Sequence, residues 1–187
     1  MRIAGGELRG RAIRTPAGEA TRPTSDRARQ AIFNILEHAA FSRGVDGARV
    51  LDLFAGSGAM GLEALSRGAA SCLFVEQAEP ALAAIRANLD AFGLGNRARI
   101  LRQDATRLAR RLDAEAPFDL AFLDPPYGKG LGETALMALH AGGWLADEAV
   151  MVLERGADEG ELSLPGFETL DERRYGAAAV LFLTLAT

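Results

Sequence analysis

The chain has 187 residues, 49% of them hydrophobic and 25% charged, with a formal net charge of -4, which predicts one globular domain and excludes a disordered or fibrous protein. No apolar run reaches the length of a membrane span, and the first residues lack the apolar core of a signal peptide, so we expect a cytoplasmic protein without membrane contact. The single cysteine, Cys72, excludes an intrachain disulfide, and the distant His38 and His140 predict no metal site.

Residues 1–15 form the first predicted element, a small hairpin in which Ile3, Leu8 and Ile13 are the apolar members. Residues 1–43 contain eight arginines against four acidic residues, whereas the remainder contains 13 basic and 21 acidic residues. A basic leading segment on an acidic body suits binding to a polyanion, although a solvated basic surface explains the charge equally well. The arginines that the hairpin would present are Arg2, Arg9, Arg11 and Arg14.

A helix is predicted next, because Ile32, Ile35 and Leu36 recur at helical spacing. Either Thr24 or Ser25 is expected to be its N-cap, and the acidic residue that follows favours the positive end of the helix. These local roles leave the preceding arginine, Arg22, without an explanation from helix capping.

From residue 44 onward, predicted strands and helices alternate, which is typical of a parallel sheet covered on both faces. The strands are expected at 49–53, 72–76, 99–102, 118–123 and 149–154, and the helices at 59–67, 80–92, 106–112 and 132–140. The last two apolar runs, 168–175 and 178–185, are joined around Gly176 without a helix. They predict a hairpin that adds an antiparallel strand at the edge of the sheet.

A glycine-rich loop follows the first of these strands, where Asp52 precedes Gly56 and Gly58. Glycine allows a sharp turn and a close approach of a ligand, and the free N–H groups of the next helix face the same place. In a parallel sheet this is the expected ligand crevice. The alternative is a turn that serves only the packing of the strand against the helix.

Two cofactors compete for this loop. Gly56, Gly58 and Gly61 spell the dinucleotide pattern G-x-G-x-x-G, and Glu76 follows Gly56 at a distance of 20 residues. A carboxylate such as Asp52, however, would repel a pyrophosphate and would attract the ammonium of a methionine moiety. We therefore favour S-adenosylmethionine.

Two further acidic residues come at or just after the ends of predicted strands. Glu76 can accept hydrogen bonds from both hydroxyls of a ribose, and its alternative role is to cap the helix that begins near Pro80. Asp104 can accept from the exocyclic amine of an adenine while the Ala105 N–H reaches a ring nitrogen. An N-cap for the predicted helix 106–112 is the alternative for Asp104.

The segment Asp124-Pro125-Pro126-Tyr127 follows the strand at 118–123. Two prolines make the turn stiff and provide no N–H, so the Asp124 carboxylate and the Pro125 carbonyl can both accept from an amine. The lone pair of a base's exocyclic amine is delocalised, and acceptors that hold its hydrogens would direct it at a sulfonium methyl group. Tyr127 would stack on the base. The alternative is that Asp124 caps a helix and Tyr127 only packs.

These residues resemble known proteins. The segment 124–127 resembles the (D/N)PP(Y/F) motif of amino-group methyltransferases, and 52–58 resembles their S-adenosylmethionine loop. Over essentially the whole chain, the sequence is similar to the RsmD family, which methylates a guanine N2 of bacterial 16S rRNA. Tyr127 stands where many relatives have Phe. The segments that carry the narrower resemblance are Arg2-Ile3-Ala4-Gly5-Gly6, Arg9-Gly10-Arg11, Arg22-Pro23-Thr24, Asp26-Arg27 and Ile32-Phe33-Asn34.

The resemblance implies an α/β fold of the Rossmann-like class I methyltransferase type. Its seven-stranded, mostly parallel sheet would carry an antiparallel C-terminal hairpin and a small N-terminal extension. Residues 1–43 would dock on RNA and cover the cofactor, and 44–187 would form the methyltransferase domain of a monomer.

The resemblance also implies roles for individual residues. The residues expected to hold S-adenosylmethionine are Arg22, Thr24, Asp52, Phe54, Gly56, Gly58, Glu76, Gln77, Asp104 and Ala105. Asp124, Pro125 and Tyr127 would handle the base. The residues expected to contact 16S rRNA in the small ribosomal subunit are Arg2, Arg9, Arg11 and Arg14.

The leading hypothesis is thus guanine-N2 methylation of 16S rRNA. The same chemistry on adenine N6 in DNA or on a glutamine amide is a second hypothesis, although no extra sequence-reading domain is evident for DNA. An RNA-binding assembly factor without turnover and a dinucleotide oxidoreductase are the others. A pure binder has no need of the glycine loop together with Asp124 and Tyr127.

Overall fold

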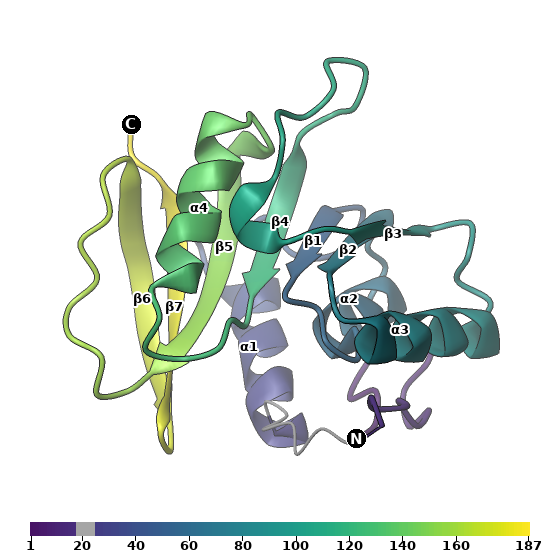
Figure 1. Cartoon of the computed structure of the whole chain (residues 1–187). Coiled ribbons are helices and arrows are strands. Elements are labelled where there is room, and N and C mark those ends of the chain that lie inside the picture. Colours follow the sequence, from purple (N-terminus) through teal and green to yellow (C-terminus); the bar gives the residue numbers. More distant parts are fainter. Residues whose placement is uncertain (18–24) are drawn as a thin grey trace.

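The computed structural model describes residues 1–17 and 25–187 and has one seven-stranded sheet with helices on both faces (Figure 1). Its helices are α1 (Asp26–His38), α2 (Ala59–Ser66), α3 (Glu79–Phe92) and α4 (Leu131–Ala141), with a short 3-10 turn, η1 (Ala105–Arg107). Its strands are β1 (Arg49–Leu53), β2 (Ser71–Glu76), β3 (Ala98–Arg102), β4 (Phe118–Leu123), β5 (Leu145–Gly156), β6 (Phe167–Tyr175) and β7 (Ala178–Leu185). Within the described residues no helix is long and apolar enough to cross a membrane.

The strand order is β3-β2-β1-β4-β5-β7-β6. The first five strands of this order are parallel, and β7 pairs antiparallel with both β5 and β6. The expected mostly parallel sheet with an antiparallel C-terminal hairpin is therefore confirmed. The order reverses between β1 and β4, and a reversal of this kind opens a crevice at the carboxyl ends of the strands.

Strand register brings the predicted site residues to one edge. Leu53, the last residue of β1, is level with the last residue of β4 and the next-to-last residue of β2. Phe54, Glu76 and Asp124 therefore lie at the same height at the carboxyl edge of three adjacent strands.

Alternation along the strands produces two hydrophobic layers, because successive side chains point to opposite faces. Val50 and Phe74 pack with apolar side chains of α1, α2 and α3, whereas Leu51 and Leu53 pack with α4 and η1. Figure 1 shows α1 behind the sheet and α4 in front of it. Both faces of the parallel strands β1, β2 and β4 are thus mostly buried, as their continuous apolar runs predicted, whereas the edge strand β3 is only partly covered.

The predicted helix 106–112 is wrong, because only the turn η1 forms there. The peptide groups that follow have partners elsewhere: the Arg111 N–H donates to the Gly142 carbonyl, and the Ala109 carbonyl accepts from the Trp144 indole. Leu108 is buried but Leu112 is 74% exposed, so the segment lacks a continuous apolar face. Tertiary hydrogen bonds therefore outweigh a helical propensity that is high, because Leu, Arg and Ala make up most of this stretch.

The predicted N-terminal hairpin is present in a short form. An antiparallel bridge joins Arg2 to Ala12, the Ile3 N–H donates to the Arg11 carbonyl at 2.9 Å, and the Ile13 N–H donates to the Met1 carbonyl at 3.0 Å. Its turns are held against α2 by Glu63, a fully buried carboxylate that accepts from the Ala4 and Gly5 N–H groups at 2.8 Å each. A two-stranded ribbon that would be marginal alone is thereby stabilised by hydrogen bonds to α2.

The start of α1 follows the expected capping pattern. The Ser25 hydroxyl accepts from the Ala28 N–H at 3.1 Å, and Asp26 lies in the first turn. Ser25 is thus the N-cap, as one of the two predicted alternatives required. The other alternative, Thr24, lies outside the described residues.

Candidate functional site

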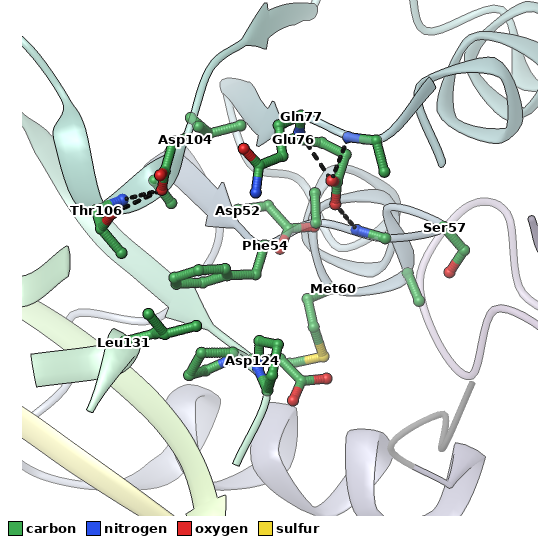
Figure 2. A pocket seen from close by; sticks show the side chains of 18 of the residues that line it. Asp52, Phe54, Ser57, Met60, Glu76, Gln77, Asp104, Thr106, Asp124 and Leu131 are labelled. Carbon is green, nitrogen blue, oxygen red and sulfur yellow. Dashed lines mark hydrogen bonds between the residues drawn. The ribbon is translucent and has the colours of Figure 1, made fainter. Parts of the chain in front are cut away.

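A cleft of about 760 Å³ opens at the carboxyl edge of the sheet (Figure 2). Loops after β1, β2, β3 and β4 line it, together with Met1 and Arg29 from the N-terminal part of the chain. Its volume is in the range of small-molecule sites. The predicted site residues that line it are Asp52, Phe54, Gly56, Glu76, Gln77, Asp104, Ala105, Asp124, Pro125 and Tyr127.

Of the predicted cofactor residues that the structure describes, Gly58 is the one that does not line the cleft. It forms the N-cap of α2 with a φ of 79°. Arg22 and Thr24 lie outside the described residues. The expected contacts of these three residues therefore stay predictions.

The glycine loop has the backbone conformation that its sequence predicted, with one addition. Gly56 has a φ of 55°, and Phe54, which is not glycine, has a φ of 54°. A left-handed conformation is uncommon for a bulky residue and indicates that the surrounding structure holds it. Gly61 serves packing, since a Cβ there would lie 2.4 Å from the Phe74 ring.

Glu76 connects the glycine loop to the start of α3. One carboxylate oxygen accepts from the Gly56 N–H at 2.9 Å, and the other accepts from the Gln77 and Ala78 N–H groups (Figure 2). Gln77 and Ala78 are the two residues before α3, so the carboxylate holds the chain that leads into the helix and does not cap its first turn. Glu76 also lines the cleft, so these hydrogen bonds are compatible with the predicted contact to a ribose.

Asp104, in contrast, has its capping role. Its Oδ1 accepts from the Thr106 N–H at 2.9 Å and from the Thr106 hydroxyl at 2.7 Å, which closes η1. These two hydrogen bonds hold the pKa of the Asp104 carboxyl below its ordinary value. Ala105 is buried against the cleft beside it, where the predicted adenine contact would be made.

Asp52 is the most deeply buried carboxyl of the cleft, with 3% of its surface exposed. Its Oδ2 accepts from the Gly61 N–H at 2.9 Å. Burial raises the pKa of Asp52 to about 8, and the nearby Glu76 adds to the effect. One hydrogen bond from Gly61 does not offset the cost of burying the charged carboxylate, so Asp52 is suited to pair with a cation that enters the cleft.

Asp124 stands at the mouth of the cleft, directly after β4. The pKa of Asp124 is raised well above its ordinary value, although the residue is partly exposed to solvent. The first cause is desolvation of the carboxyl by the surrounding protein, and the second is repulsion by the carboxylates of Glu154 and Asp52. The alternative role of Asp124 as a helix cap is wrong, since α4 begins at Leu131 with Gly130 as its N-cap. The acid is therefore available to the cleft.

Tyr127 is half-buried in the same loop, and its hydroxyl donates to the carboxylate of Glu154. Glu159 supports the loop further by accepting from the Gly128 N–H at 3.2 Å. Sequence reasoning missed both glutamates. Glu154 had a recognisable signal, because it lies near the end of the strand next to β4, as Glu76 lies at the end of β2.

The four predicted RNA-binding arginines divide into two pairs. Arg2 donates to the Gly10 carbonyl at 2.7 Å, and Arg11 donates to the Ala91 carbonyl at 2.7 Å. Arg9 and Arg14 are exposed, and within the described residues their guanidinium groups have no hydrogen bond or ion pair. In the part of the chain that the structure describes, Arg9 and Arg14 are thus the pair whose guanidinium donors are unused.

Comparisons with known proteins find relatives that match most of the chain. The family model described as "Conserved hypothetical protein 95" matches residues 1–184. "Ribosomal RNA small subunit methyltransferase D" of Escherichia coli strain K12 is 38% identical over 165 residues, which cover 88% of this chain and 79% of the relative. "Putative rRNA methyltransferase YlbH" of Bacillus subtilis is 41% identical over 157 residues, 83% of this chain and 79% of the relative.

A solved structure extends the likeness to three dimensions. The Escherichia coli protein described as "Putative methyltransferase yhhF" superposes with a TM-score of 0.84 at 34% identity, and the match covers 99% of this chain and 97% of that one. The expected class I methyltransferase fold is confirmed by such neighbours. With a family match over nearly its full length, the chain belongs to the RsmD family that the model "Conserved hypothetical protein 95" describes.

Proposed function

We propose that this protein transfers the methyl group of S-adenosylmethionine to N2 of a guanine in the 16S rRNA of the small ribosomal subunit. The observation that carries the proposal is that one cleft contains both the glycine loop tied to Glu76 and the Asp124-Pro125-Pro126-Tyr127 segment. The relatives' names, which specify ribosomal RNA of the small subunit, support the choice of substrate.

The cofactor would lie along the carboxyl ends of β1, β2 and β3. Glu76 would accept from the ribose hydroxyls, Asp104 and Ala105 would meet the adenine, and Asp52 would pair with the ammonium of the methionine end. When bound, the sulfonium supplies an electrophilic methyl group. Its positive charge would also lower the pKa of the nearby carboxyls and favour their ionised forms.

The base would enter at the mouth of the cleft. The Asp124 carboxylate and the Pro125 carbonyl would accept from the two hydrogens of the amine and direct its lone pair to the methyl group. Tyr127, held through its hydroxyl by Glu154, would stack on the ring. After transfer, the nitrogen carries an extra proton, and a carboxylate with a raised pKa is suited to accept it.

The two parts of the chain would have different tasks in this scheme. Residues 1–43 would dock on the ribosomal particle and cover the cofactor, and 44–187 would carry out the transfer as a monomer. The basic character of 1–43 supports the docking role.

The direct test is transfer of labelled methyl from S-adenosylmethionine to small ribosomal subunits that lack the modification, followed by digestion of the RNA to nucleosides. Label in N2-methylguanosine is the expected result. Label in DNA oligonucleotides or in a protein glutamine, with none in the particle, would overturn the proposed substrate. Binding of NADH without binding of S-adenosylhomocysteine would overturn the cofactor as well.

Replacing Glu76 by Gln is expected to weaken S-adenosylhomocysteine binding by about 10-fold to 100-fold. The amide presents an NH2 group either to the Gly56 N–H or to the N–H groups at the start of α3, and the ribose loses a charged acceptor. Isothermal titration measures the loss. Glu79→Gln is the control, because Glu79 is exposed and pairs with Arg86 and Arg102 outside the cleft. Equal affinities for both variants would contradict the role of Glu76.

Replacing Arg9 and Arg14 together by Ala is expected to weaken binding to the small subunit and to reduce the slope of log affinity against log salt by about 1 to 2. Both guanidinium groups are exposed, so they would neutralise phosphates. Filter binding at several KCl concentrations measures the slope. Arg110→Ala is the control, since Arg110 is exposed outside the N-terminal segment and pairs with Asp113. A slope unchanged from the wild type would exclude these contacts.

A further inference from the structure

Arg29 is a buried arginine whose donors are only partly used. Its side chain is 1% exposed, its Nε donates to Glu63 at 3.3 Å, and its Nη2 donates to Asp26 at 2.9 Å and to the Arg2 carbonyl. The remaining nitrogen, Nη1, is buried and has no hydrogen-bond partner among the described residues. A buried donor left without a partner is costly, and a charged donor more so.

Arg29 is one of the residues that line the cleft. Its partner Glu63 belongs to α2, whose first residues, Ala59 and Met60, also line the cleft. Arg29 therefore approaches from the α2 side, and Gly61 of the same helix donates to Asp52. Figure 2 shows Asp104 and Thr106 on one side of the cleft, and Ser57 and Met60 on the other.

The α2 side of the cleft thus combines an acceptor and a donor. Asp52 is a buried carboxyl that suits an ammonium, and Arg29 has an unused N–H that suits a carboxylate. An α-amino acid in its zwitterionic form presents both groups on one carbon. Because Glu63 and Asp26 already balance the charge of Arg29, Nη1 would contribute a directed, charge-assisted hydrogen bond more than a net charge.

We propose that Nη1 of Arg29 donates to the carboxylate of the methionine end of the cofactor and selects ligands that carry this group. This inference rests on the proposed cofactor. It also links the cofactor to the N-terminal segment, since the same guanidinium holds the Arg2 carbonyl and Glu63 holds the Ala4 and Gly5 N–H groups.

The test compares S-adenosylhomocysteine with 5′-methylthioadenosine, which lacks the amino-acid end, by isothermal titration. In Arg29→Lys the affinity for S-adenosylhomocysteine is expected to fall by about 10-fold to 100-fold, while that for methylthioadenosine stays within about threefold. Arg67→Lys is the matched control. Arg67 also binds Glu63, at 2.8 Å, but does not line the cleft, so both affinities should fall equally or not at all.

The outcomes separate the inference from the function on which it rests. No binding of S-adenosylhomocysteine to the wild type overturns the proposed cofactor. Equal losses for both ligands in Arg29→Lys, or a selective loss in Arg22→Gln but not in Arg29→Lys, overturns the assignment to Arg29 alone.

Hydrogen exchange of the wild-type protein provides a second measurement that does not depend on the folding of Arg29→Lys. Saturating S-adenosylhomocysteine is expected to slow exchange at the Ala4 and Gly5 amides more than saturating methylthioadenosine does. Equal protection by the two ligands would contradict the proposed link through Arg29.

Discussion

Replacing Asp124 by Ala is expected to lower the rate of methyl transfer by about 100-fold to 1,000-fold, the size of effect seen when one oriented polar group is removed from a reacting centre. The carboxylate would hold the amine hydrogens and accept the proton that leaves the nitrogen. Because Asp124 stands at the mouth of the cleft, away from Glu76 and Asp104, the affinity for S-adenosylhomocysteine should stay within about threefold. Single-turnover transfer to small subunits measures the rate, and isothermal titration measures the affinity.

Asp119→Ala is the matched control for this variant. Asp119 lies near the other end of the same strand, β4, and its carboxylate accepts from the Arg49 N–H at 2.8 Å. Its replacement should leave both the rate and the cofactor affinity near wild-type values. A fall in cofactor affinity as large as the fall in rate in Asp124→Ala would assign Asp124 to the cofactor instead of the amine.

The strands could be predicted from the sequence, and so could the meeting of the site residues in one cleft, because both depend on local patterns. Apolar runs that end in an acid and a turn mark the carboxyl ends of parallel strands, and such ends meet at one edge of a sheet. This is why Asp52, Glu76 and Asp124 were expected in one cleft, where the structure places them. Glu76 holds the residues that lead into α3 and also lines the cleft, so the ribose contact stays a prediction.

The buried network around Glu63 could not be predicted in the same way. Its partners Ala4, Gly5 and Arg29 precede Glu63 by 34 to 59 residues, and no spacing rule links them. Read alone, Arg29 and Glu63 look like solvent-facing residues of two amphipathic helices. The predicted helix 106–112 failed for a related reason, because its peptide groups bond to the connection between α4 and β5.

Replacing Asp52 by Asn is expected to stabilise the ligand-free protein at pH 8 and to weaken cofactor binding by about 100-fold. Burial raises the pKa of Asp52 from an ordinary 3.8 to about 8, so the folded protein holds this proton more tightly than the unfolded chain does. The free energy of unfolding that Asp52 contributes therefore falls as pH rises from about 4 to 8, by up to about 1.4 kcal/mol per pH unit. Asn carries no charge, so the free energy of unfolding of Asp52→Asn does not fall in this way.

Urea denaturation at pH 6 and pH 8 measures the effect, and the stability of Asp52→Asn relative to wild type should increase between these values. Asp104→Asn is the control: hydrogen bonds lower the pKa of Asp104, so its contribution is lost only near and below pH 4 and its difference from wild type should be the same at both values. Because a bound ammonium needs the ionised carboxylate, wild-type binding of S-adenosylhomocysteine at pH 7 should release a proton, detected as a dependence of the titration heat on the buffer. Asp52→Asn should release none. Equal proton release by both proteins would show that the cation does not pair with Asp52.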